Sequence, residues 1–178
     1  MIAISFKTVF ILISFLWLVI RSFFWFKNKK IDLKRESKLL FVYICIVVIA
    51  RFTFFPFEKI DGMLQPLFFD PKNVFPPRIN LVPFINLFDY PELKPALLNF
   101  IGNTAMFIPV GIIWPAVFRE LENCRKALLS GFGYTLMIEI LQLPFIDRVS
   151  DIDDLILNFV GFSAGYGIWL LFKKIRKQ

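Results

Sequence analysis

The sequence predicts an all-α membrane protein, a polytopic bundle of about five transmembrane helices. Its 178 residues are 57% hydrophobic and include 24 phenylalanines, and the mean hydropathy of +0.66 is too high for a soluble domain of this length. Five apolar stretches are long enough, or nearly so, to cross a hydrocarbon core of about 30 Å. They run roughly from Ile4 to Phe26, Leu39 to Phe57, Leu97 to Phe118, Ala127 to Ile146 and Leu155 to Phe172.

The distribution of lysine and arginine predicts the orientation of these helices. Thirteen of these cations lie in the first connection, the third connection and the tail, against five in the two opposite loops. The positive-inside rule therefore places the N-terminus outside and the C-terminus in the cytoplasm. Because the cations flank membrane segments, we expect them to face anionic lipid, and we predict no nucleic-acid partner. The first stretch lacks a cleavage site of the signal-peptide type, so we expect it to remain as a helix.

We expect a single domain over residues 1–178, with an outward loop at residues 58–96 that is rich in proline and phenylalanine. Between Pro56 and Pro95 the chain holds eight of its eleven prolines, which excludes a long helix there. Within this loop, the segment from Asn80 to Phe84 fits two interpretations equally. It is either a proline turn capped by Asn80 or a lid over a site.

Polar residues enter the last apolar stretch along one helical face. Asp151, Asp154, Asn158, Gly161 and Gly165 are spaced three or four residues apart, so they stack on that face. Carboxylates facing lipid would cost about 2.5 to 3.5 kcal/mol at the bilayer centre, so we expect this face to point into a bundle or a wet cavity. The two glycines predict close packing of a neighbouring backbone, or a homo-oligomer contact.

Other stretches carry polar residues at a similar depth. A rise of about 1.5 Å per residue places Arg51 and Glu139 roughly 18 Å above the cytoplasmic ends of their helices, which predicts a structural ion pair, with Arg148 as the competing partner. We expect an outward-facing polar cavity that binds a ligand through Asn80, Asn103, Glu139, Gln142, Arg148, Asp151, Asp154 and Asn158. The alternative is that these groups only hold the helices together.

The chain contains no histidine, which excludes Ser-His and Cys-His catalysis and imidazole metal sites. A Gly-rich phosphate loop and a C-x-x-C pair are absent as well, and we predict no metal and no cofactor. If the protein is an enzyme, Glu139, Asp151 and Asp154 are the candidates for acid and base, because carboxylates in unlike environments can take unlike roles.

Four motifs follow one another between residues 80 and 161. They are Asn80-Leu-Val-Pro-Phe84, Asn103-Thr-Ala-Met-Phe-Ile-Pro-Val-Gly111, Ile138-Glu139-Ile-Leu-Gln142, and Asp151-Ile-Asp-Asp154 with Asn158 and Gly161. In this order they resemble the VanZ-like family, membrane proteins named after a teicoplanin-resistance factor. The resemblance implies a multi-pass protein of the bacterial cytoplasmic membrane. It also implies membrane lipid, and a lipid-linked cell-wall precursor or lipoglycopeptide, as partners.

Three functions fit these observations. The first is a non-enzymatic membrane factor that contributes to low-level lipoglycopeptide resistance or envelope protection by binding a lipid-linked or amphipathic ligand. The second is an intramembrane acid/base enzyme acting on a lipid-linked cell-envelope substrate, although no serine is marked as an activated nucleophile. The third is a small transporter or flippase, which would have to work as an oligomer because five spans without an inverted repeat are few. We prefer the first.

Overall fold

The computed structural model describes all residues except 56–58, 61, 85–92 and 177–178. It divides into two compact units, an N-terminal unit from Met1 to Asp70 and a C-terminal unit from Pro71 to Gln178. The expectation of a single domain stays a prediction. The helices are α1 (Phe6–Asn28), α2 (Leu33–Phe54), α4 (Leu93–Val117), α5 (Cys124–Gln142) and α6 (Ile152–Ile175), with short 3-10 helices η1 (Pro71–Val74) and η2 (Arg119–Glu122).

The predicted helical class is confirmed by these five long helices. Within the described part of the chain, four of them are long and apolar enough to cross a membrane, namely α1, α2, residues 99–117 of α4, and α6. The exception in this set is α5, whose sequence includes Gly131, Thr135, Glu139 and Gln142. A fifth span and the predicted orientation therefore stay predictions.

Capping side chains set where several helices begin. Ser5, Asp32, Asn123 and Asp151 each accept a hydrogen bond from a backbone N–H in the first turn of α1, α2, α5 and α6, respectively. Such caps satisfy helix donors that have no partner within the helix. The caps explain why α2 begins at Leu33, before the predicted start at Leu39, since the helix includes a charged segment that hydropathy leaves out.

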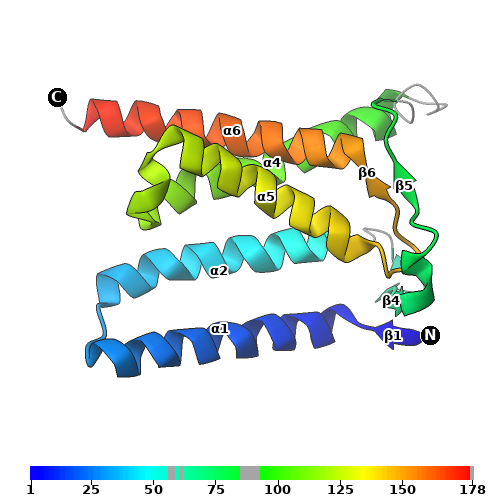
Figure 1. Cartoon of the computed structure of the whole chain (residues 1–178), viewed down its shortest axis with the longest axis horizontal. Helices are drawn as coiled ribbons and strands as arrows, with labels where there is room; N and C mark the ends of the chain where they lie inside the picture. The colour runs from blue at the N-terminus through cyan, green and yellow to red at the C-terminus, as the bar shows by residue number, and fades with distance from the viewer. Residues whose placement is uncertain (56–58, 61, 85–92, 177–178) are drawn as a thin grey trace. The chain divides into compact units, whose positions relative to one another are not determined.

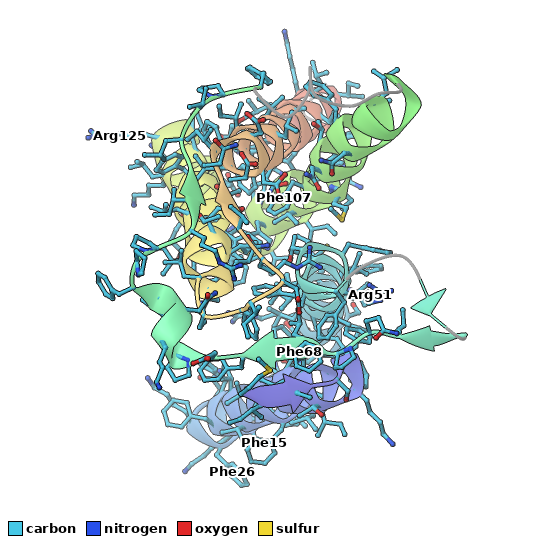
Figure 2. The ribbon with its side chains drawn as sticks, turned by 90° about the vertical axis from the view of Figure 1, so that its right-hand side faces the viewer. Phe15, Phe26, Arg51, Phe68, Phe107 and Arg125 are labelled. Carbon is cyan, nitrogen blue, oxygen red and sulfur yellow. The ribbon has the colours of Figure 1, made fainter. Side chains whose placement is uncertain are left out.

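The N-terminal unit consists of two antiparallel helices and short strands (Figure 1). Strand β1 (Ile2–Ile4) pairs antiparallel with β4 (Leu67–Phe69), and β2 (Lys59–Ile60) pairs with β3 (Met63–Leu64). The Ser14 and Tyr43 hydroxyls share a hydrogen bond of 2.7 Å between α1 and α2. On α1, Phe15 and Phe26 point away from α2 (Figure 2) and are 61% and 83% exposed, as expected of side chains that face lipid.

In the C-terminal unit, α6 lies beside α4, and α5 packs next to them (Figure 1). A Cβ atom added to Gly161 would lie 2.0 Å from the carbonyl oxygen of Thr104, and one at Gly165 would lie 2.1 Å from that of Ile108. A Cβ atom added to Gly111 of α4 would likewise lie 2.0 Å from the carbonyl oxygen of Phe162. Small residues thus allow the two backbones to touch, and the ring of Phe107 is fully buried beside this seam.

This packing confirms one of the two interpretations of the glycine face. We predicted that Gly161 and Gly165 admit a neighbouring backbone or form a homo-oligomer contact. Both glycines are buried, and the backbone that they admit is α4 of the same chain. The homo-oligomer stays a prediction.

Candidate functional site

A pair of two-residue strands joins the loop before α4 to the start of α6. Strand β5 (Ile79–Asn80) runs parallel to β6 (Ser150–Asp151), with Asn80 opposite Asp151. The Asn80 side-chain amide donates to both carboxylate oxygens of Asp151, at 3.3 and 3.2 Å. Its own oxygen accepts from the backbone N–H of Val82 at 3.2 Å, which forms the capped turn that we predicted. The lid interpretation stays a prediction.

Asp151 has three polar roles at this point. Its side chain caps α6 by accepting from the Asp153 N–H at 3.0 Å, and it receives the Asn80 amide. Its backbone N–H donates to the Glu139 carboxylate at 2.9 Å. Asp151 therefore connects the end of α5 to the start of α6, and Glu139 is only 3% exposed beneath it.

We expect Asp151→Ala to destabilise the protein by about 1 to 2 kcal/mol, because α6 loses its N-cap and Asn80 loses its acceptor. Asp151→Ser should recover part of this loss, since serine is also a good cap. Thermal unfolding of the purified protein in detergent measures the difference. The control is Asp147→Ala, because Asp147 is exposed in the same loop. Equal midpoints for Asp151→Ala and Asp147→Ala would contradict the capping role.

A second contact joins α4 to α6. The Asn103 amide donates to the Asp154 carboxylate and lies 3.4 Å from the Asn99 side-chain oxygen. The carboxylates of Asp154 and Glu139 also repel each other electrostatically. Those of Asp151 and Asp153 repel Asp154 as well. Asn80, Asn103, Glu139, Asp151, Asp153 and Asp154 thus form one connected group, which we call the polar cluster.

Sequence reasoning missed several members of this region. The Asp153 carboxylate accepts from the Phe84 N–H at 2.7 Å, and Phe84 has a positive φ of 61°. The Asn73 amide donates to the carbonyl oxygens of Leu143 and Phe145, both at 3.1 Å, and Arg78 donates to Phe145 at 2.9 Å. No signal of spacing could have found Asn73 and Arg78, because their partners are backbone atoms about seventy residues away.

Asn158 lies one turn beyond Asp154 and is 1% exposed. Its side-chain oxygen has no hydrogen-bond partner within the described part of the chain, and the same holds for the Thr104 hydroxyl of α4. Gly161, three residues further along α6, packs against the Thr104 carbonyl, so Asn158 stands between two α4–α6 contacts. A buried amide oxygen without a donor is costly, which makes this atom a candidate acceptor for a ligand or water.

The remaining predicted site residues fall in different places. Gln142 is buried at the end of α5. Arg148 attracts Asp154 electrostatically, and the net charge of the surroundings remains acidic. Among the described residues, no group of three or more acidic or cysteine side chains is arranged to hold a metal ion.

The hydroxyl of Ser163 donates to the Phe159 carbonyl one turn back on α6, at 2.8 Å, which is an ordinary helix contact.

Arg51 belongs to the N-terminal unit. Its guanidinium donates to the Phe55 carbonyl at 3.0 Å and lies 5.8 and 5.5 Å from the ring centroids of Phe6 and Phe52. These contacts give the cation local partners within its own unit. The ion pair with Glu139 would join the two units, and it stays a prediction.

The profile of the VanZ/LLP1 family matches residues 40–173. This chain belongs to the VanZ/LLP1 family. The match extends well beyond the four motifs and includes α2 from Leu40 onward, so Arg51 lies inside the family region. The uncharacterized membrane protein YwnJ of Bacillus subtilis (strain 168) is 30% identical over 107 residues, which cover 58% of this chain and 71% of YwnJ. No solved structure matches the chain significantly.

Membership and the four apolar helices together identify a multi-pass membrane protein. The VanZ family is associated with teicoplanin resistance in general. All members of the polar cluster lie inside the matched region, which leaves out α1 and the first residues of α2.

Proposed function

We propose that this VanZ-like protein protects the cell envelope by binding a lipid-linked or amphipathic molecule at the polar cluster. The observation that carries the proposal is the convergence of four carboxylates and two amides where α5 ends and α6 begins. Most of these groups are tied to one another, so their geometry is set before a ligand arrives.

The chemistry of the cluster favours a ligand with amine, sugar or peptide groups. Glu139, Asp151, Asp153 and Asp154 bring four carboxylates together, and Arg148 is the cation that acts on Asp154. Carboxylates bind ammonium groups through charge-assisted hydrogen bonds, which are stronger than neutral ones. The Asn158 oxygen adds a buried acceptor next to this group.

An amphipathic ligand fits the location of the cluster. Asp154 is in the first turn of α6, a helix apolar enough to span the membrane, so the cluster lies at one end of a membrane helix. A headgroup bound there would leave its acyl chain beside apolar surface, such as the exposed side chains of Ile101, Leu141 and Val160. With the predicted orientation, this end faces outward, where lipid-linked cell-wall precursors and lipoglycopeptides act.

The test is the minimal inhibitory concentration of teicoplanin, beside vancomycin, in a susceptible Gram-positive host that expresses the protein. We expect the wild type to raise the minimal inhibitory concentration of teicoplanin several-fold. The Asp154→Asn variant should abolish this rise. Asparagine keeps a carbonyl acceptor for Asn103 and removes the charge, so the fold should persist. Immunoblots of membrane fractions verify that the wild type and the variants are present at equal levels.

Asp147→Asn is the matched control, because it removes one negative charge from an exposed position in the segment between α5 and α6. It should leave the protection intact. If Asp154→Asn protects as well as the wild type does, the polar cluster is not the binding site. If the wild type changes neither concentration, this chain is not a lipoglycopeptide-protection factor.

A further inference from the structure

A second polar site lies in the N-terminal unit, far in sequence from the polar cluster. A cavity of about 210 Å³ opens where the end of α1 meets the start of α2. Charged and amphipathic side chains line it, among them Arg21, Trp25, Lys30, Arg35 and Glu36. We call it the basic cavity.

Two of the cavity's charges neutralise each other. The Arg21 guanidinium donates two hydrogen bonds to the Glu36 carboxylate, one of them 2.9 Å between Nε and Oε2. Asp32, also in the lining, is engaged as the cap of α2, where it accepts from the N–H groups of Lys34 and Arg35. The acidic groups of the cavity therefore have partners already.

Lys30 and Arg35 remain as cations without an ion pair within the described residues. The lining carries three cations and two carboxylates, so its formal net charge is +1. Lys27, Lys29, Lys34 and Lys38 belong to the same stretch of sequence and add further positive charge to it. The partial positive charge at the N-terminus of α2 acts in the same direction. The site favours an anion.

The position of the cavity identifies the kind of anion. Both α1 and α2 are apolar enough to span the membrane, and only Lys29 to Asp32 connect them, so the cavity lies at a membrane surface. Lipid phosphates lie at this depth, and the indole of Trp25 is typical of it. Phe23 and Phe26 on the last turns of α1 are 62% and 83% exposed, which offers apolar surface to acyl chains.

We propose that the basic cavity binds the phosphate of an anionic phospholipid headgroup through Lys30 and Arg35, with the acyl chains along the exposed phenylalanines of α1. The Arg21–Glu36 pair forms the wall of the site and holds the two helices in place. This site is independent of the polar cluster, because all of its residues belong to the N-terminal unit.

The test counts bound lipids by native mass spectrometry of the full-length protein in a non-ionic detergent. Phosphatidylglycerol and phosphatidylcholine are titrated separately. We expect the wild type to prefer phosphatidylglycerol and Lys30→Gln with Arg35→Gln to lose affinity for it on the order of tenfold. Lys27→Gln with Lys34→Gln is the matched control, since it removes the same charge outside the lining and should keep most of the preference.

Three outcomes would overturn the proposal. The first is a wild type that binds both lipids equally. The second is an equal loss in the two double variants, which would mean that general surface charge attracts the lipid. The third is displacement of the lipid by inorganic phosphate at similar concentrations, which would make the site one for free phosphate. The double variant Lys30→Arg with Arg35→Lys is the control for a folding defect. It keeps both positive charges, so it should bind phosphatidylglycerol as the wild type does.

Discussion

Replacing Gly161 by alanine is expected to destabilise the protein by roughly 1 to 3 kcal/mol or more, the range for overpacked sites. The added Cβ would lie 2.0 Å from the Thr104 carbonyl oxygen, far inside van der Waals contact. The obstacle is backbone, which cannot rotate away, so α4 and α6 would have to separate. That movement would also strain the Asn103–Asp154 contact, which lies two turns earlier on α6.

The control for Gly161 lies on the same helix. Gly167 has nothing within 4 Å of an added Cβ, so Gly167→Ala meets no steric barrier. Alanine is favoured over glycine within a helix by about 1 kcal/mol, so this variant should be neutral or slightly stabilising. Thermal unfolding in detergent, followed by size-exclusion chromatography, compares the two. If both variants unfold at the wild-type temperature, the backbones of α4 and α6 do not touch as described.

Replacing Arg21 by leucine is expected to cost roughly 3 kcal/mol, because it leaves a largely buried carboxylate without its counter-ion. The Arg21 and Glu36 side chains are 10% and 19% exposed in their ion pair. Without Arg21, the partly buried Glu36 carboxylate would lose both of its hydrogen bonds from the guanidinium, and an unpaired buried acceptor is costly. Thermal unfolding and the amount of protein in the membrane measure the effect.

A double variant separates the ion pair from side-chain packing. Arg21→Leu with Glu36→Leu removes both charges and should recover most of the lost stability, since an apolar pair can replace a buried ion pair. The comparison is Lys173→Gln in the pair with Glu122, whose side chains are 32% and 40% exposed. That change should cost at most about 1 kcal/mol. If the double variant is less stable than Arg21→Leu alone, the charge of Glu36 is not the cause.

Hydropathy predicted the helices well where the chain is uniformly apolar and less well at their ends. The predicted stretch from Leu155 begins three residues late, because the structure starts α6 at Ile152 on the cap formed by Asp151. At the end of α5, Leu143 is the C-cap, and Pro144 after it has no backbone N–H with which to continue the helix. Caps and prolines decide such boundaries, and a window average cannot register them.

The candidate site was predictable in part. Asp151, Asp154, Asn103 and Glu139 could be found because polar groups inside apolar stretches are conspicuous. Asp153 was passed over, since it lies off the face shared by Asp151 and Asp154 and its donor is the backbone of Phe84. Arg21 and Glu36 were also missed as a pair, because they belong to different helices and neither spacing nor hydropathy relates them.

The sequence by itself determined that this is a membrane protein and which family it resembles. These properties are sums over neighbouring residues or ordered short motifs, so no folding is needed to evaluate them. Tertiary structure alone decided that the glycine face of α6 receives α4, that Asn80 binds Asp151, and that α1 and α2 enclose a basic cavity. Those outcomes depend on backbone approach and side-chain direction between segments distant in sequence, which local patterns do not specify.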